Sequence, residues 1–299
     1  EMLRVAGYRT ALISDVYHMF KPSKNFWRGF HQWMFLRGQE TDPARSGPDL
    51  TREEIDFWLP KELQNEASIA FIRQCILNMR DRRREEEYFA PRVFREAALW
   101  LEQNQDANPF FLTVESFDPH EPWLAPAHYV RAYYNGPAHE QIKSGYTETQ
   151  LASDLNVRTQ ANYSATVTLC DRWFGYFMEQ VRVQGLLENT VIIVTSDHGH
   201  SIGDRGYCGK RGYPSVPEVY DVPLMIRFPG AKHAGKTCDA YVQHIDITAA
   251  ILELAGAEPA TPIDGISFLG TALEDGKAAR DHVTVGWGTY PTVITPKWW

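Results

Sequence analysis

An aspartate and a histidine stand side by side at positions 197 and 198, directly after an apolar run. Residues 191–195 (Val-Ile-Ile-Val-Thr) are β-branched, which predicts a buried strand that ends at this polar pair. Open α/β sheets bind ligands beyond the carboxyl ends of their strands, where Asp197 and His198 would lie. A carboxylate offers hard oxygens and an imidazole offers a nitrogen, so the pair could hold a divalent cation.

Two further residues favour a ligand site at this turn. Gly199 lets the backbone bend close to a bound group, because glycine has no Cβ. Lys210 ends a glycine-rich loop and offers a point charge that suits an anionic oxygen. A lone Asp-His pair after a strand can equally be turn chemistry, so the interpretation depends on the longer string around it.

A second polar loop follows another apolar run, residues 109–117, which predicts a strand. The loop reads Asp118-Pro119-His120-Glu121-Pro122-Trp123. Prolines on both sides of His120 stiffen the loop and would hold the imidazole at the carboxyl end of the strand. Taken alone, a histidine in such a loop can be structural or catalytic.

The elements that must position these residues alternate between helices and strands, which predicts an α/β fold. Strands are expected over residues 10–14, 109–117, 191–196 and 223–228, and helices over residues 61–84, 91–103, 156–187 and 244–254. Residues 41–60 contain several prolines and predict a long excursion of the chain. The mixed-sign charge run at residues 80–87 is interpreted as a solvated helix face.

The composition excludes some classes of protein. Of the 299 residues, 43% are hydrophobic and 23% are charged, as in a globular domain. The formal net charge of −8 argues against a nucleic-acid partner, which would require a basic face. It does not exclude an anionic substrate, because a metal ion and a few local cations can dominate a site. No apolar run reaches the length of a membrane span.

The string from Thr195 to Gly230 resembles the sulfatases of the alkaline-phosphatase superfamily. It contains Thr195-Ser196-Asp197-His198-Gly199, Gly203-Asp204, Gly209-Lys210, Val222-Pro223-Leu224-Met225-Ile226 and Phe228-Pro229-Gly230. The D-P-H-x-P-W segment at residues 118–123 and a G-Y-x-T-A step at residues 7–11 extend the resemblance to nearly the whole chain.

The resemblance implies a fold and an activity. The fold would be α/β, with a mostly parallel central sheet flanked by helices on both faces. We expect one domain over residues 1–299, incomplete at both ends, in which a C-terminal subdomain could start at about residue 281. The activity would be metal-dependent cleavage of a sulfate ester carried by a small molecule or a saccharide.

The resemblance also implies roles for four residues. Asp197 and His198 would bind the metal, with calcium expected and magnesium, manganese or zinc as alternatives. Lys210 would contact the sulfate. His120 would hydrogen-bond the ester oxygen and help the leaving group depart. This role suits imidazoles in general, because they can gain or lose a proton near neutral pH.

Two parts of the family pattern are absent from this sequence. Sulfatases also bind their metal through adjacent aspartates, and their nucleophile is a formylglycine made from the Cys or Ser of a C-x-P-x-R motif. The sequence has no adjacent aspartates. The C-x-P-x-R motif begins at none of the four cysteines, which are Cys75, Cys170, Cys208 and Cys238. We therefore expect a fragment that binds metal weakly and is inactive by itself.

Three alternatives stay open. The chain could belong to a phosphodiester or phosphonate monoester hydrolase of the same superfamily, or be a non-catalytic pseudo-enzyme that only holds an anion. Residues 199–203 also fit G-x-S-x-G, the nucleophile elbow of serine α/β-hydrolases, with Ser201, Asp264 and His282 in the required order. The glycines and the proline of residues 204–214 argue against the helix that this elbow needs.

Overall fold

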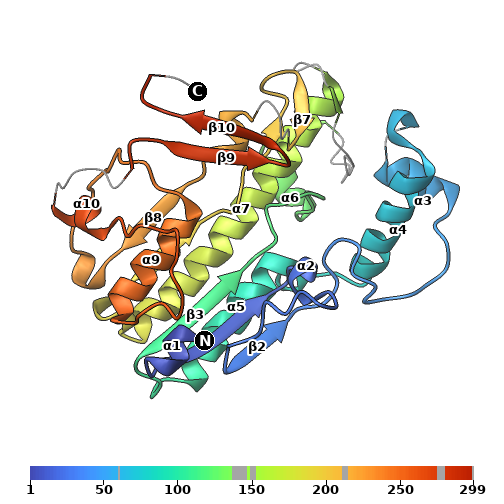
Figure 1. The fold of residues 1–299 in the computed structure, drawn as a ribbon. Helices are drawn as coiled ribbons and strands as arrows, with labels where there is room; N and C mark the ends of the chain where they lie inside the picture. Colours follow the sequence, from blue (N-terminus) through green and yellow to red (C-terminus); the bar gives the residue numbers. More distant parts are fainter. Residues whose placement is uncertain (60, 137–146, 149–152, 211–214, 275–279, 298–299) are drawn as a thin grey trace. The chain divides into compact units, whose positions relative to one another are not determined.

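The computed structural model describes the chain apart from residues 60, 137–146, 149–152, 211–214, 275–279 and 298–299 (Figure 1). The backbone divides into two compact units. The larger unit comprises Arg9–Gln184 and Ile202–Cys208, and the smaller unit comprises Glu1–Tyr8, Gly185–Ser201 and Gly209–Trp299. His120 therefore belongs to the larger unit, whereas Asp197, His198 and Lys210 belong to the smaller one.

The larger unit contains a three-stranded parallel sheet of order β2-β1-β3. Its strands are β1 (Arg9–Ser14), β2 (Gln32–Phe35) and β3 (Phe110–Glu115). In this register Leu12 lies opposite Trp33 on one side and Thr113 on the other. All residues of β1 after Arg9 are buried, as expected for the middle strand of a parallel sheet.

Two long helices of the larger unit pack against each other (Figure 1). They are α5 (Phe89–Gln103) and α7 (Asp154–Val183). The Phe94 ring meets the Phe174 ring edge to face, with centroids 5.9 Å apart. Both helices lie where the hydrophobic periodicity predicts them. Together with the parallel sheet, they confirm the predicted α/β fold.

The long excursion predicted over residues 41–60 contains a helix, α3 (Arg52–Trp58). A capping box starts this helix: the Thr51 hydroxyl accepts the Glu54 N–H at 3.2 Å, and the Glu54 carboxylate accepts the Thr51 N–H at 2.8 Å. α4 (Glu66–Met79) follows and ends earlier than predicted. Buried residues of this region form an apolar cluster, consisting of Leu59, Ile72, Ile76 and Leu124.

Shorter elements complete the larger unit. They are α2 (Tyr17–Phe20), η1 (Lys61–Leu63), η2 (Glu85–Glu87), α6 (Ala127–Val130) and a small sheet of order β4-β7-β6, formed by β4 (Thr147–Glu148), β7 (Tyr207–Gly209) and β6 (Ser201–Ile202). The ends of β6 and β7 lie where the chain passes between the two units.

The smaller unit contains a two-stranded antiparallel sheet, in which Ile193 lies opposite Ile226. Its strands are β5 (Ile192–Thr195) and β8 (Leu224–Arg227). The other elements are α1 (Met2–Val5), η3 (Leu186–Glu188), α8 (Pro217–Tyr220), η4 (Pro229–Ala231), α9 (His244–Ala255), α10 (Leu269–Glu274) and the hairpin of β9 (Val283–Trp287) with β10 (Tyr290–Ile294).

The strand before Asp197 differs in burial from its prediction. Ile192, Ile193 and Val194 are half-buried and Thr195 is exposed, whereas the sequence predicts a buried strand. β8 and α9 contribute to the apolar cluster of this unit, which is built on Ala250, Phe268 and Leu269. α9 ends at Gly256, whose positive φ of 60° gives the left-handed C-cap that the sequence predicts.

Across the parts of the chain that the structure covers, no helix is both long enough and apolar enough to cross a membrane.

Replacing Leu12 by Ala tests the contribution of the middle strand. Leu12 is 1% exposed, so the substitution leaves a cavity and should lower the free energy of unfolding by about 2–5 kcal/mol. Leu99→Ala is the matched control, because Leu99 in α5 is 42% exposed and should cost less than about 1 kcal/mol. Chemical denaturation measures both losses. Equal losses would contradict the placement of β1 in the core.

Candidate functional site

Asp197 and His198 lie at the end of β5, where the sequence places them. The His198 Nε2 atom is 3.5 Å from Oδ2 of Asp197. The other carboxylate oxygen, Oδ1, accepts the His198 backbone N–H at 2.8 Å. The Asp197 side chain is 85% exposed and the His198 side chain 38% exposed. The pair therefore presents one oxygen and one nitrogen at the same strand end, within reach of solvent.

A hydrogen bond selects the His198 nitrogen that faces Asp197. Nδ1 lies 3.0 Å from the carbonyl oxygen of Gly199. Because a carbonyl can only accept, we assign the proton of the neutral ring to Nδ1. Nε2 then carries the lone pair, which is the arrangement that metal-binding histidines use.

Gly199 makes this turn sterically feasible. Its N–H donates to the carbonyl of Val219 at 2.7 Å. A Cβ at position 199 would lie 2.1 Å from the Glu218 carbonyl oxygen, far inside van der Waals contact. Two more hydrogen bonds support the turn: the Ser196 hydroxyl donates to the His198 carbonyl at 2.9 Å, and His244 Nε2 lies 2.8 Å from the Ser196 carbonyl.

The geometry of the pair fits one shared cation. Protein ligands lie about 2.0–2.6 Å from Zn²⁺ or Ca²⁺, so two ligands at a right angle are about 3–3.5 Å apart. The distance of 3.5 Å between Asp197 Oδ2 and His198 Nε2 agrees with this value. Among the described residues, no group of three or more His, Cys, Asp or Glu side chains is arranged to hold a metal. The role of Asp197 and His198 as metal ligands therefore stays a prediction.

Lys210 directly follows β7 in the sequence and is half-buried. It belongs to the same unit as Asp197 and His198, whereas His120 belongs to the other. The convergence of all four side chains on one ion therefore stays a prediction.

His120 lies in the loop after β3, with 20% of its side chain exposed. Its Nδ1 atom is 2.6 Å from the backbone oxygen of Glu121 and 3.2 Å from the carboxylate of the same residue. The Phe117 ring packs on the imidazole, with centroids 4.0 Å apart. These contacts hold the ring at Nδ1 and fix its orientation.

Two buried carboxyl groups hold the His120 loop in place. Asp15, directly after β1, accepts the Phe117 N–H at 2.7 Å. Asp118 accepts the N–H of Ala90, in the first turn of α5, at 3.2 Å. Asp15 is 0% exposed and Asp118 6% exposed. The loop is thus fixed to both the sheet and α5.

Burial determines the charge of these carboxyl groups. It raises the pKa of Asp118 to about 6 and the pKa of Asp15 well above its usual range, with the nearby Asp118 charge adding to the rise at Asp15. Asp15 Oδ2 is buried and has no hydrogen-bond partner among the described residues, which disfavours its ionised form. Arg82 opposes the Asp118 charge, and burial lowers the pKa of this guanidinium to about 10.

Sequence reasoning did not assign a role to Asp15 or Asp118. Their positions carry the signal that could have found them: Asp15 follows β1 directly, and Asp118 follows β3 by three residues. Since these strands are parallel neighbours, both carboxyl groups lie at the same edge of the sheet.

The structure disfavours the serine-hydrolase alternative. Ser201 lies in β6 and is 2% exposed, so its hydroxyl does not face solvent as a nucleophile would. The chain continues through a turn into β7 rather than into the helix that a nucleophile elbow requires.

Replacing Gly199 by Ala should distort the turn that holds Asp197 and His198. The added methyl group would overlap the Glu218 carbonyl, so we expect the free energy of unfolding to fall by about 1–3 kcal/mol. Gly175→Ala in α7 is the matched control, because nothing lies within 4 Å of its added Cβ, and it should stabilise by about 0.5–1 kcal/mol. Denaturation curves would refute the steric account if both variants shifted stability in the same direction.

Asp118 should make stability depend on pH. Its pKa is raised in the folded state, so its contribution is present below about pH 4 and is lost as the pH rises through about 6. Asp118→Asn keeps an acceptor for the Ala90 N–H but removes the titration, so the decline of melting temperature between pH 4 and 7 should flatten. Asp106→Asn, at an exposed position, should leave the slope unchanged. An unchanged slope in the Asp118 variant would contradict the assignment.

Comparison with known proteins identifies the family. The family model described as Sulfatase matches residues 1–257. The multifunctional alkaline phosphatase superfamily protein PehA of Trinickia caryophylli is 27% identical over 264 residues, covering 78% of this chain and 49% of PehA. The N-acetylglucosamine-6-O-sulfatase of Bacteroides thetaiotaomicron is 34% identical over 120 residues, covering 40% of this chain and 21% of that protein. The chain spans about half the length of PehA.

Solved structures show the same fold. One of them is a protein solved in complex with its substrate, D-glucosamine-2-N,6-O-disulfate. It superposes on this chain with a TM-score of 0.67 at 18% identity, and the match covers 98% of this chain and 70% of the other. The phosphonate monoester hydrolase of Agrobacterium radiobacter superposes with a TM-score of 0.62 at 20% identity, covering 95% and 63%. The Sulfatase family model spans most of the 299 residues of this chain. The chain therefore belongs to the sulfatase family, within the alkaline-phosphatase superfamily.

Proposed function

We propose that this chain supplies the metal-binding and leaving-group residues of an enzyme that hydrolyses sulfate esters. The observation that carries the proposal is the Asp197–His198 pair, whose geometry suits one cation in a chain of the sulfatase family. Calcium is the expected ion, with magnesium, manganese or zinc as alternatives. When bound, the ion would neutralise charge on the sulfuryl oxygens.

The chain's own residues would divide the remaining work. Lys210 would bind a sulfate oxygen through its ammonium group. His120 would present Nε2 to the ester oxygen and give it a proton as the S–O bond breaks, so that the alcohol leaves uncharged. The contacts of His120 with Glu121 and Phe117 would hold the ring in orientation for this transfer.

The proposed substrate is a sulfate ester on a saccharide or another small molecule. Relatives support this class: one is an N-acetylglucosamine-6-O-sulfatase, and one structural neighbour binds a disulfated glucosamine. The neighbouring phosphonate monoester hydrolases share the fold, so a phosphonate ester is the second candidate.

The nucleophile does not come from a C-x-P-x-R motif in these 299 residues, since the sequence contains none. We therefore expect the purified chain to bind metal weakly and to hydrolyse p-nitrophenyl sulfate and p-nitrophenyl phenylphosphonate little or not at all. Clear turnover of either ester would contradict the inactivity and would show which chemistry the site supports.

Calorimetric titration with Ca²⁺ tests the metal assignment. The chain should bind with a dissociation constant of about 10⁻⁴–10⁻³ M, and Asp197→Asn should weaken binding at least about tenfold. Asp239→Asn removes the same charge at an exposed position of the same unit and should leave binding unchanged. Absence of binding to Ca²⁺, Mg²⁺, Mn²⁺ and Zn²⁺ would favour the non-catalytic anion-binding alternative.

A further inference from the structure

Five aromatic side chains form a cluster at the surface of the larger unit, which we call the aromatic cluster. They come from α2, β2 and the chain between them, which Figure 1 draws in blue. The members are Tyr17, Phe20, Trp27, Trp33 and Phe35. Four of them are only half-buried, and Trp33 is 49% exposed. Because proteins usually enclose packed aromatic rings in the core, this accessible group indicates a surface that meets a ligand.

The rings hold one another in fixed positions. The Phe20 ring stacks on Phe35, with centroids 4.3 Å apart, and on Trp27, with centroids 5.7 Å apart. Trp33 completes a triangle, because its ring centroid lies 5.6 Å from that of Phe20 and 5.5 Å from that of Trp27. The cluster therefore presents aromatic surface whose orientation is set before a ligand arrives, which lowers the entropic cost of binding.

The segment that carries the cluster is basic, although the whole chain is acidic. Residues 16–39 contain no Asp or Glu, whereas the formal net charge of the chain is −8. The cationic residues of this segment are Lys21, Lys24, Arg28 and Arg37. Asp42 neutralises Arg37 through two hydrogen bonds of 2.7 Å. The excess of positive charge in this segment favours an anionic ligand.

Lys21 is a cation with a defined position beside the rings. Its ammonium group lies 4.7 Å from the centroid of the Tyr17 ring. It also donates to Nδ1 of His18 at 3.0 Å, because an ammonium group can only donate. The other nitrogen of His18, Nε2, lies 3.0 Å from Oε2 of Glu40. The Glu40 carboxylate thus pairs with His18, while the ammonium group of Lys21 lies over a ring of the aromatic cluster.

The aromatic cluster adjoins the loop of His120. α2 follows β1 and the His120 loop follows β3, and these strands are parallel neighbours, so both segments lie at the same edge of the sheet. The Phe117 ring contacts both sides, with its centroid 6.0 Å from the His18 ring and 4.0 Å from the His120 ring. All of these residues belong to the larger unit. A chain-like ligand at His120 would therefore extend toward the aromatic cluster.

We propose that the aromatic cluster binds a sulfated oligosaccharide. The apolar C–H face of one sugar ring would pack on the exposed Trp33 ring, and the hydroxyl groups would stay in water. A sulfate group of the same sugar chain would lie against the ammonium group of Lys21. That these sugars adjoin the cleaved ester rests on the proposed hydrolytic function of His120, whereas the binding itself does not.

Aromatic and basic residues together also bind anionic membranes. Two observations favour the saccharide. The rings of the cluster pack against one another, which leaves a surface rather than single side chains that could insert between lipids. The cluster also adjoins the His120 loop through Phe117.

NMR spectroscopy of the tryptophan indole N–H groups in the full chain tests the site directly. The Trp33 signal is identified by its loss in Trp33→Phe. It should shift on titration with a heparin-derived tetrasaccharide, and cellotetraose, a neutral chain of the same length, should bind at least about fivefold more weakly. No shift with the sulfated chain, or equal affinity for both chains, would overturn the proposal. A shift with phosphatidylserine vesicles but not with the sulfated chain would also overturn it, in favour of a membrane surface.

A charge variant tests the role of Lys21. Lys21→Gln should weaken binding of the heparin tetrasaccharide about two- to fivefold and leave the affinity for cellotetraose unchanged. Lys232→Gln removes the same charge at an exposed position of the smaller unit and should change neither affinity. Because damage to the fold would weaken both sugars by the same factor, the ratio of the two affinities is the measurement that decides. An unchanged ratio in Lys21→Gln would overturn the proposal.

An aromatic variant tests the surface on which the sugar would pack. Trp33→Ala should weaken binding of both tetrasaccharides about three- to tenfold in calorimetric titrations. Tyr176→Ala removes another exposed ring of the larger unit, 41% exposed in α7, and should leave both affinities unchanged. Equal affinities in Trp33→Ala and the unaltered chain would contradict the proposal.

The saccharide titrations require neither turnover nor a metal ion, so their outcome is separate from that of the calcium titration. Calcium binding without saccharide binding would overturn only the role of the aromatic cluster. Saccharide binding without binding of any divalent cation would support the cluster and contradict only the metal assignment of Asp197 and His198.

Discussion

The close approach of the backbone at Gly199 is the constraint on which the candidate metal pair depends. The Glu218 carbonyl lies 2.1 Å from the place of a side chain at position 199, so only glycine allows the turn. The same turn brings the Gly199 carbonyl to Nδ1 of His198 and leaves Nε2 on the side of Asp197. The steric need for glycine at position 199 thus determines which atoms of Asp197 and His198 could face a cation.

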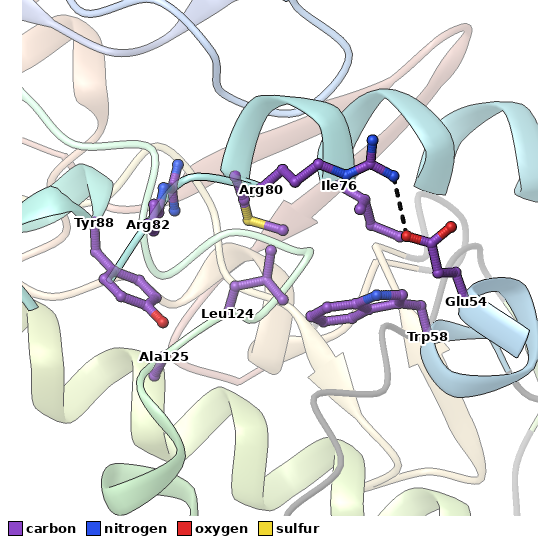
Figure 2. Close-up of a pocket in the computed structure, with 9 residues that line it drawn as sticks. Glu54, Trp58, Ile76, Arg80, Arg82, Tyr88, Leu124 and Ala125 are labelled. Atoms are coloured by element: carbon purple, nitrogen blue, oxygen red, sulfur yellow. Dashed lines mark hydrogen bonds and ion pairs between the residues drawn. The ribbon is translucent and has the colours of Figure 1, made fainter. Parts of the chain in front are cut away.

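A different constraint positions His120. Its loop is held by carboxyl groups that are expensive to bury, Asp15 and Asp118, each of which accepts a backbone hydrogen bond. Burial favours their uncharged forms, and Arg82 offsets the charge of Asp118 when that group ionises. Arg82 also lines a pocket of about 320 Å³ in the larger unit (Figure 2), next to the support of the His120 loop.

The parts of the fold with strong local patterns could be predicted from the sequence. The spacing of apolar residues places α5 and α7, and Gly256 marks the end of α9. The position of Asp197 and His198 after a strand follows from the β-branched run before them. These features depend on the chemistry of neighbouring residues, which a single sequence records.

Features that depend on distant partners could not be predicted in this way. The pairing of β5 with β8 is antiparallel, and the sequence of each strand does not specify its neighbour. β2 was missed because it has four residues and its Trp33 is 49% exposed, which weakens the alternation of a strand. The burial of Asp15 and Asp118 was missed because charged residues are usually solvated, and only the fold shows which ones are enclosed.

Paramagnetic line broadening by Mn²⁺ tests most directly whether the four residues converge on one cation. In spectra of the histidine rings, substoichiometric Mn²⁺ should broaden both His198 and His120, and it should leave His233, an exposed histidine of the smaller unit, sharp. Broadening of the Lys210 side-chain signals would complete the assignment. If His198 broadened while His120 stayed as sharp as His233, the shared site for sulfate-ester cleavage would be contradicted.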